Sequence, residues 1–140
     1  MHQHVVLRVV TKLLMPFILL FALYVQFHGD YGPGGGFQAG VIFGACFILY
    51  ALIYGVKNAR KVAPETALRL VFAAGLLLYV GVGYAGLALG GKFLDYNVLA
   101  PDPVGGQHLG ILLVELGVGT TVAATMVIVF FIFAERASRT

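Results

Sequence analysis

The stretch LGILLVELGVGTTVAATMVIVFFIFA, residues 109–134, decides the class of fold that this chain adopts. Among its 26 residues, the only polar side chains are one carboxyl group, that of Glu115, and three threonines. A helix of about 20 apolar residues spans the roughly 30 Å hydrocarbon core of a bilayer. The stretch therefore predicts a transmembrane helix that carries one carboxyl group inside the membrane.

The composition of the whole chain extends this prediction. Of its 140 residues, 60% are hydrophobic and 11% are charged, and the mean hydropathy is +0.94, whereas soluble domains carry about 25% charged residues. The chain is an integral membrane protein, too poor in polar groups for a soluble catalytic lobe and without the basic stripe of a nucleic-acid binder. Its single cysteine, Cys46, lies in an apolar run, so we expect a small buried side chain and no disulfide or thiolate metal site.

Four segments are long and apolar enough to span a membrane. They predict an all-α integral membrane protein with residues 1–140 as a single membrane domain, and the expected helices cover 5–27, 37–56, 66–90 and 109–134. Glycines four residues apart favour close helix packing over a dedicated dimer face. These glycines are Gly36, Gly40 and Gly44 in one segment and Gly86 and Gly90 in another.

Positive charges are sorted between the two sides of the predicted membrane. The termini and the connection at 57–65 share one side, and the connections at 28–36 and 91–108 share the other. Because cytoplasmic segments are enriched in Lys and Arg, we expect both termini to be cytoplasmic and the glycine-rich connection 28–36 to be outside. The second side carries only Lys92, and the first carries Arg8, Lys12, Lys57, Arg60, Lys61, Arg69, Arg136 and Arg139.

The connection HGDYGPGGGFQAG, residues 28–40, joins the first two predicted helices. Three glycines after Pro33 leave the backbone free to adopt positive φ and leave amide N–H groups at the start of the second helix. Such a connection suits the close approach of an anion or of another backbone, but it lacks the Lys and Ser/Thr of a phosphate-binding loop. A tight turn with a purely structural role is the alternative interpretation.

Glu115 is the second distinctive feature. It lies about 10 Å inside the fourth predicted span, where a charged carboxylate costs at least about 2.5 kcal/mol. His108 precedes it by seven residues and falls on the same helix face. A histidine at the outer mouth and a carboxyl group deeper on one stripe suit a proton or cation path. The alternative is a structural hydrogen bond from Glu115 to a neighbouring helix, with His108 as an interfacial anchor.

The run PGGGF at 33–37, after a His-Gly pair and before a second membrane helix, resembles the signature of the B-type subunit (MnhB, MrpB, PhaB) of multisubunit Mrp-type Na⁺/H⁺ antiporters. The same domain occurs in the membrane arm of energy-converting hydrogenases. The resemblance covers nearly the whole chain. Two positions depart from the family pattern, because Asp30 stands where the family commonly has His and Ala39 where it has Gly.

The resemblance implies an accessory subunit of a cation/proton antiporter in the bacterial inner membrane, without catalytic activity, cofactor or metal. Its implied partners are large complex I-like subunits, and its transported ions are Na⁺ and H⁺. A purely structural scaffold, or the equivalent subunit of a hydrogenase or complex I-like assembly, is the alternative. The ion-path candidates are Glu115, His108, Asp30 and His28, and the candidates for a structural motif or subunit contact are Pro33, Gly34, Gly35, Gly36, Phe37 and Gly40.

Overall fold

The computed structural model describes residues 5–29 and 31–137, in which every regular element is a helix. The long helices are α1 (Val5–His28), α2 (Gly36–Tyr54), α4 (Glu65–Ala88) and α5 (Pro103–Ala137), and the short ones are α3 (Val56–Val62) and the 3-10 helix η1 (Tyr96–Val98). Each of the four long helices is long and apolar enough to cross a membrane. The predicted all-α fold with four membrane spans is therefore confirmed.

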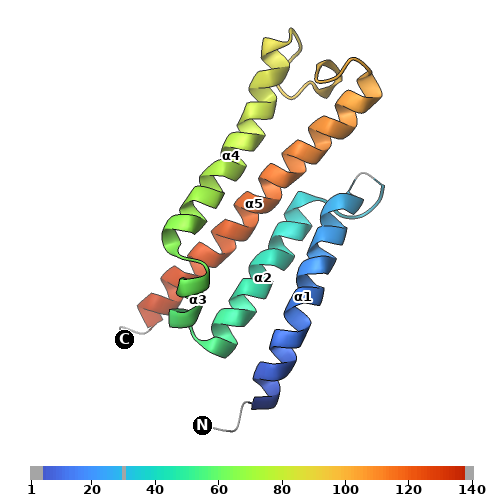
Figure 1. The fold of residues 1–140 in the computed structure, drawn as a ribbon. Helices are drawn as coiled ribbons and strands as arrows, with labels where there is room; N and C mark the ends of the chain where they lie inside the picture. Colours follow the sequence, from blue (N-terminus) through green and yellow to red (C-terminus); the bar gives the residue numbers. More distant parts are fainter. Residues whose placement is uncertain (1–4, 30, 138–140) are drawn as a thin grey trace.

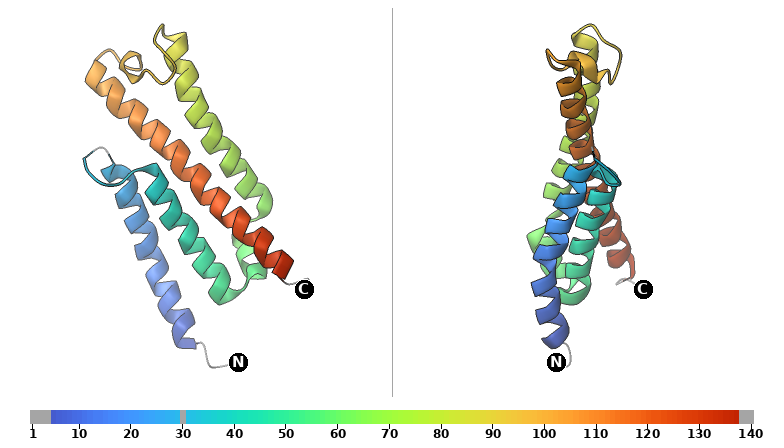
Figure 2. Two further views of the ribbon diagram at one scale, coloured as in Figure 1. Left: turned by 180° about the vertical axis from the view of Figure 1, so that it is seen from behind. Right: turned by 90° about the vertical axis from the view of Figure 1, so that its right-hand side faces the viewer.

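Helix α5 lies at the centre of the fold (Figure 1). Helix α4 packs along its N-terminal part, α2 packs along its C-terminal part, and α1 packs mainly on α2. Seen from the edge, the four helices form one thin layer (Figure 2). The α1–α2 hairpin is displaced along α5 relative to the α4–α5 hairpin, so the connection between α1 and α2 lies part-way along α5 (Figure 1).

Glycines on α2 determine how closely it approaches α5. A methyl group on Gly40 would lie 2.5 Å from the carbonyl oxygen of Gly119, and one on Gly36 would overlap the backbone of Glu115. Gly44 faces the side chain of Met126 on α5, with the nearest backbone atom, the carbonyl oxygen of Ala123, 3.4 Å from a methyl group placed on Gly44. Small residues let helix backbones approach closely where hydrocarbon provides no hydrophobic driving force. The four-residue glycine spacing on α2 thus serves packing within the chain, as the sequence indicated.

Helices α4 and α5 also meet at glycines. A methyl group on Gly117 would lie 2.8 Å from the carbonyl oxygen of Gly75, and the hydroxyl groups of Thr120 and Thr121 fill the space beside Gly75. The Thr120 hydroxyl donates to the carbonyl oxygen of Leu116 at 2.8 Å, and the Thr121 hydroxyl donates to that of Gly117 at 2.7 Å. These hydroxyl groups are therefore satisfied within their own helix, the usual arrangement for mid-helix threonines.

Helix α4 ends two residues before the predicted end of the third span. Gly90 follows it with a φ of +88°, and the N–H of Gly91 donates to the carbonyl oxygen of Gly86 at 3.0 Å. This is the hydrogen-bonding pattern of a glycine-terminated helix. The expected packing pair of Gly86 and Gly90 is therefore wrong for Gly90, which ends the helix and has open space around it.

Helix α5 begins at Pro103, six residues before the predicted start at 109. The side chain of Asp102 accepts a hydrogen bond from the N–H of Gly105 at 3.0 Å, and proline suits the first position of a helix. Tyr96 of η1 packs on Gly110, which holds the connection against this added part of the helix. The acid-proline pair therefore outweighs the low helix propensity of the glycines that follow it.

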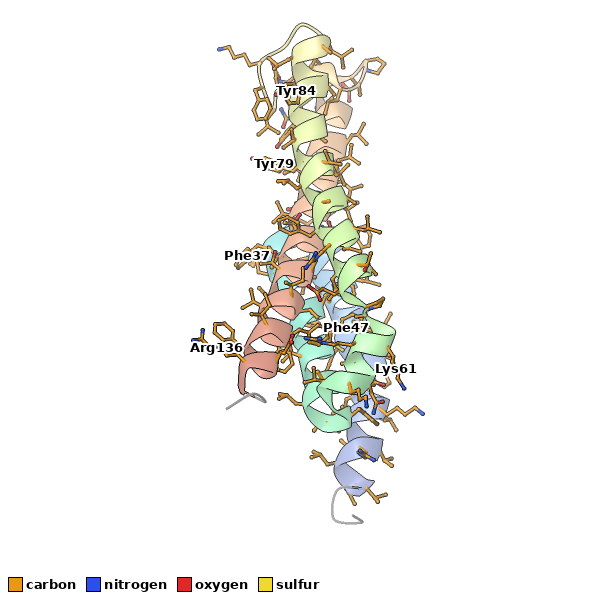
Figure 3. All side chains as sticks on the ribbon, turned by 90° about the vertical axis from the view of Figure 1, so that its left-hand side faces the viewer. Phe37, Phe47, Lys61, Tyr79, Tyr84 and Arg136 are labelled. Atoms are coloured by element: carbon orange, nitrogen blue, oxygen red, sulfur yellow. The ribbon has the colours of Figure 1, made fainter. Side chains whose placement is uncertain are left out.

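Helix α3 lies in the predicted connection 57–65 and anchors it to α5. Arg60 donates a hydrogen bond to Glu135 at 3.0 Å. Lys61 and Arg136 lie at the same end of the bundle (Figure 3), where both ends of the described chain also lie (Figure 1). A small buried cluster closes this end and consists of Ala51, Ala59, Val127 and Phe131.

Cys46 lies in the interface between α1 and α2. Its side chain is 1% exposed, and its Sγ lies 3.8 Å from the carbonyl oxygen of Met15. The expectation of a small buried side chain is confirmed. At the other end of this interface, the hydroxyl group of Tyr54 donates to the carbonyl oxygen of Arg8 at 2.7 Å.

Candidate functional site

The carboxyl group of Glu115 lies against the glycine-rich connection between α1 and α2. A methyl group on Gly29 would lie 2.5 Å from Oε1 and 2.8 Å from Oε2, and one on Gly35 would lie 2.8 Å from Oε1. At Gly36 the contact is with the backbone of Glu115. We call these three glycines the Glu115 seat. Two features that lie far apart in the sequence thus form one site, because only residues without side chains leave room for the carboxyl group.

Hydrogen bonds turn the connection back over the last turn of α1. The carbonyl oxygen of His28 accepts from the N–H groups of Tyr31 and Gly32 at 3.0 and 3.1 Å, and the N–H of Gly35 donates to the carbonyl oxygen of Val25 at 3.0 Å. Gly35 has a φ of +110°, a conformation that strongly favours glycine. The backbone of the connection is therefore held in place by the helix that precedes it.

The Glu115 seat coincides with the N-terminal end of α2. Gly35 is the N-cap residue and has no side chain with which to cap the helix, and the first turn of α2 contains no acidic residue. A helix N-terminus carries about half a positive charge and stabilises a nearby carboxylate by about 0.3–1 kcal/mol, and by up to about 2 kcal/mol when partly buried. Glu115 is half-buried and reaches this end from a different helix. The dipole of α2 thus offsets part of the penalty for a carboxylate in a membrane.

Another ion-path candidate, His28, adjoins the connection that covers Glu115. His28 is the last residue of α1, is half-buried, and stacks on Tyr24 with ring centroids 5.2 Å apart. Asp30 lies outside the described residues, although its neighbour Gly29 belongs to the Glu115 seat. The structure therefore places His28 at the edge of the connection that holds the carboxyl group.

His108 lies on α5, nearer than Glu115 to the start of that helix. It precedes Glu115 by two turns of α5, about 10 Å, and its side chain is exposed. Within residues 5–29 and 31–137, no group of three or more His, Cys, Asp or Glu side chains is placed to hold a metal ion. The arrangement offers a carboxyl group that can exchange a proton or bind a cation.

The remaining motif residues divide into buried and exposed groups. Gly34 packs against the carbonyl oxygen of Val25, and Gly40 packs against α5. Pro33 is exposed, and Phe37, which is 61% exposed, projects away from the bundle (Figure 3). Of the residues proposed for subunit contact, Pro33 and Phe37 are exposed and Gly34 is half-buried, whereas Gly35, Gly36 and Gly40 are buried.

One polar residue of this region was not identified from the sequence. Gln26, in the last turn of α1, is 5% exposed. Its Oε1 would lie 2.8 Å from a methyl group on Gly119, one turn beyond Glu115 on α5. The available signal was a single amide side chain directly after the apolar run at 13–25.

Comparison with known proteins identifies the family of this chain. Residues 6–128 match a family described as a domain related to the MnhB subunit of Na⁺/H⁺ antiporters. The chain is 33% identical over 131 residues to the B-type subunit of the Na⁺/H⁺ antiporter of Bacillus subtilis, an alignment that covers 86% of this chain and 91% of the relative. It is 30% identical over 132 residues to the protein of the same name from Alkalihalophilus pseudofirmus, with 87% and 91% coverage. The chain therefore belongs to the family of domains related to the MnhB subunit of Na⁺/H⁺ antiporters.

Proposed function

We propose that this chain is an accessory membrane subunit of a multisubunit Na⁺/H⁺ antiporter and that Glu115 lines part of its ion path. The relatives named above are B-type antiporter subunits of bacteria, which favours a transporter subunit over an enzyme and an antiporter over a hydrogenase. The expected partners are the other antiporter subunits, including large complex I-like ones. Residues 1–140 act as one membrane domain with both termini in the cytoplasm.

The observation that carries the ion path is the position of the Glu115 carboxyl group. It lies among backbone atoms of the Glu115 seat at the positive end of α2, so the ionised form gains stabilisation there. A carboxyl group in this position can bind Na⁺ in its ionised form or take up a proton in place of Na⁺.

A scaffold function is the second candidate, because the same contacts hold three helices together. The Glu115 seat joins α1, α2 and α5, and most glycines of the motif are used inside the chain. In addition, the outer face of α1 is apolar and exposed, as Phe17 (61%) and Phe21 (56%) illustrate. In this alternative Glu115 has a structural role, and α1 faces lipid or another protein of the complex.

Substitution of Glu115 separates the two functions. In everted vesicles that carry the complete complex, we expect Glu115→Gln to assemble normally and to lose the Na⁺-dependent change in ΔpH. Glu135→Gln is the matched control, because Glu135 lies on the same helix at its half-exposed end, and it should retain antiport. Full activity of Glu115→Gln would exclude the ion path. If Glu115→Ala prevents assembly of the complex while Glu115→Gln assembles and transports normally, Glu115 has the structural role of the scaffold alternative.

Single cysteines test the orientation of the chain. Tyr31 and Lys57 are exposed and lie on opposite sides of the expected membrane. In a Cys46→Ser background, an impermeant thiol reagent added to intact cells should label Tyr31→Cys and leave Lys57→Cys unlabelled. Labelling of Lys57→Cys alone would show that the chain has the opposite orientation.

A further inference from the structure

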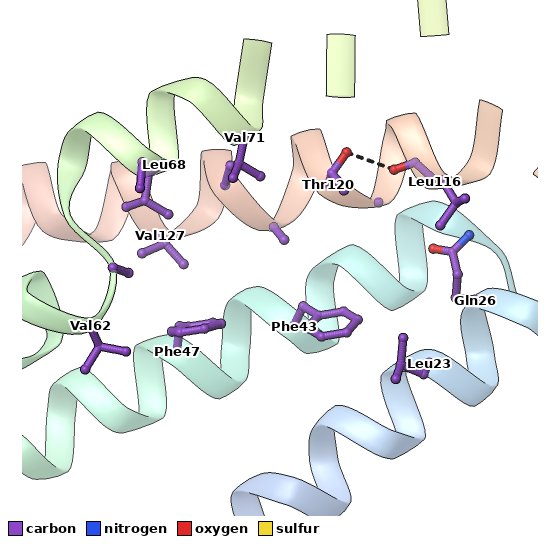
Figure 4. A pocket seen from close by; sticks show the side chains of 15 residues that line it. Leu23, Gln26, Phe43, Phe47, Val62, Leu68, Val71, Leu116, Thr120 and Val127 are labelled. Carbon is purple, nitrogen blue, oxygen red and sulfur yellow. Dashed lines mark hydrogen bonds between the residues drawn. The ribbon is translucent and has the colours of Figure 1, made fainter. Parts of the chain in front are cut away.

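A cavity of about 470 Å³ lies between the two hairpins. It extends from Gln26 and Leu116 at one end to Val62, the last residue of α3, at the other (Figure 4). Apart from Gln26 and Thr120, its lining side chains are apolar. Hydrogen-bonding side chains are therefore confined to the part of the cavity that lies towards Glu115.

The amide group of Gln26 has an unusual environment. The residue is 5% exposed, and its Nε2 has no hydrogen-bond partner among the residues that the structure describes. Buried donors without a partner are rare and destabilising, and an ordered water with two to four polar contacts is a common partner in protein interiors. The carbonyl oxygen of Gly36 lies beside Gly119 together with the Gln26 amide and provides a second contact for such a water. A water needs only about 30 Å³, so space is not limiting.

Gln26 stands between the cavity and the Glu115 seat. Gly29 of the seat follows Gln26 by three residues, just after the end of α1. On α5, Gly119 contacts Oε1 of Gln26 and lies one turn beyond Glu115. The amide thus borders the cavity on one side and, one helical turn away, the carboxyl group on the other.

We propose that Gln26 is a positioning residue for Glu115: its amide holds a water at this end of the cavity, and that water exchanges protons with the Glu115 carboxyl group. In the exchange the carboxyl O–H bond breaks, the proton passes to the water oxygen, and the carboxylate remains at the N-terminus of α2. A lipid chain or an apolar side chain in the same place would leave Nε2 unpaired. Hydrogen bonding therefore favours water as the occupant. The inference rests on the proposed ion path.

Antiport in everted vesicles with the complete complex provides the first test. Gln26→Met keeps the shape of the side chain and removes the hydrogen bond, and we expect about a tenfold lower rate, equivalent to about 1.4 kcal/mol. Gln26→Asn should restore the rate to within about threefold of the wild type, because it keeps an amide donor. Leu23→Met, in the same cavity lining, is the control and should be fully active.

Glu115→Gln, measured in parallel, distinguishes the two ways in which the test can fail. Full antiport in Gln26→Met, together with an inactive Glu115→Gln, overturns only the inference about Gln26. Full antiport in Glu115→Gln overturns the proposed ion path and the inference with it.

Thiol labelling tests the water directly and leaves Gln26 in place. Ala123 lines the cavity one turn beyond Gly119. In a Cys46→Ser background of the complete complex, a small charged methanethiosulfonate should react with Ala123→Cys, because thiolate forms only in contact with water. Phe133→Cys, at a 66% exposed apolar position, is the control and should stay unlabelled. An unreactive Ala123→Cys would show that lipid or a partner helix fills the cavity, and would overturn the inference.

Discussion

Replacement of Gly36 by alanine should force α2 away from α5 at the Glu115 seat. The added methyl group would overlap the carbonyl group of Glu115 and lie 2.9 Å from the α-carbon of that residue, whereas ordinary van der Waals separation begins at 3.4 Å. From the distance to the α-carbon alone, the helices must separate by at least 3.4 − 2.9 = 0.5 Å. The opposing atoms belong to a helix backbone and cannot rotate away as a side chain would.

Two opposing effects set the magnitude. Extra atoms in a well-packed interface typically cost about 1–3 kcal/mol, and a clash with backbone belongs at the upper end of that range. Alanine in place of a helical glycine contributes about 1 kcal/mol of stabilisation. The expected net destabilisation is therefore about 2 kcal/mol. Gly81 on α4 is the matched control, because a methyl group there has no neighbour within 4 Å and Gly81→Ala keeps only the favourable effect.

Thermal stability of the detergent-solubilised complex measures this difference. After heating, fluorescence-detected gel filtration of a tagged chain should give a lower midpoint for Gly36→Ala, by roughly 2–4 °C per kcal/mol. The midpoint of Gly81→Ala should equal or exceed that of the wild type. If Gly36→Ala and Gly81→Ala have the same midpoint, α2 and α5 do not make the contact on which the Glu115 seat depends.

Two more predictions concern the seat and the connection before α5. Gly29→Ala should lower antiport several-fold in everted vesicles, because its methyl group would lie 2.5 Å from Oε1 of Glu115. Gly105→Ala is the control and should retain antiport, because the atom nearest to its methyl group lies at 3.6 Å. Equal rates for the two variants would contradict the contact between Gly29 and the Glu115 carboxyl group. Burial, with a smaller contribution from Tyr79, raises the pKa of Tyr96 above its ordinary value of 10.0. The folded state then holds this proton more tightly than the unfolded chain, so stability falls as the pH rises above that value. Tyr96→Phe should reduce the alkaline loss of thermal stability, and an unchanged loss would refute this assignment.

Much of the fold can be predicted from local patterns in the sequence. Four apolar segments specify four helices, because a backbone surrounded by hydrocarbon must satisfy its hydrogen bonds within the segment. The end of α4 and the start of α5 were placed less well. Asp102 and Pro103 indicate a helix start, but the glycines that follow argue against one, and the contact of Tyr96 with Gly110 belongs to tertiary structure.

The sequence by itself therefore determined the class of fold, the family and the two features that matter, namely the glycine-rich connection and the carboxyl group of Glu115. Only the tertiary structure decided that these features form one site. Their contact depends on how far the α1–α2 hairpin is displaced along α5, and close packing of Gly36 and Gly40 against α5 sets that displacement. No local pattern encodes the register between helices so far apart in the chain. The same reason explains why Gln26, a single amide directly after an apolar run, gained significance only once its neighbours on α5 were known.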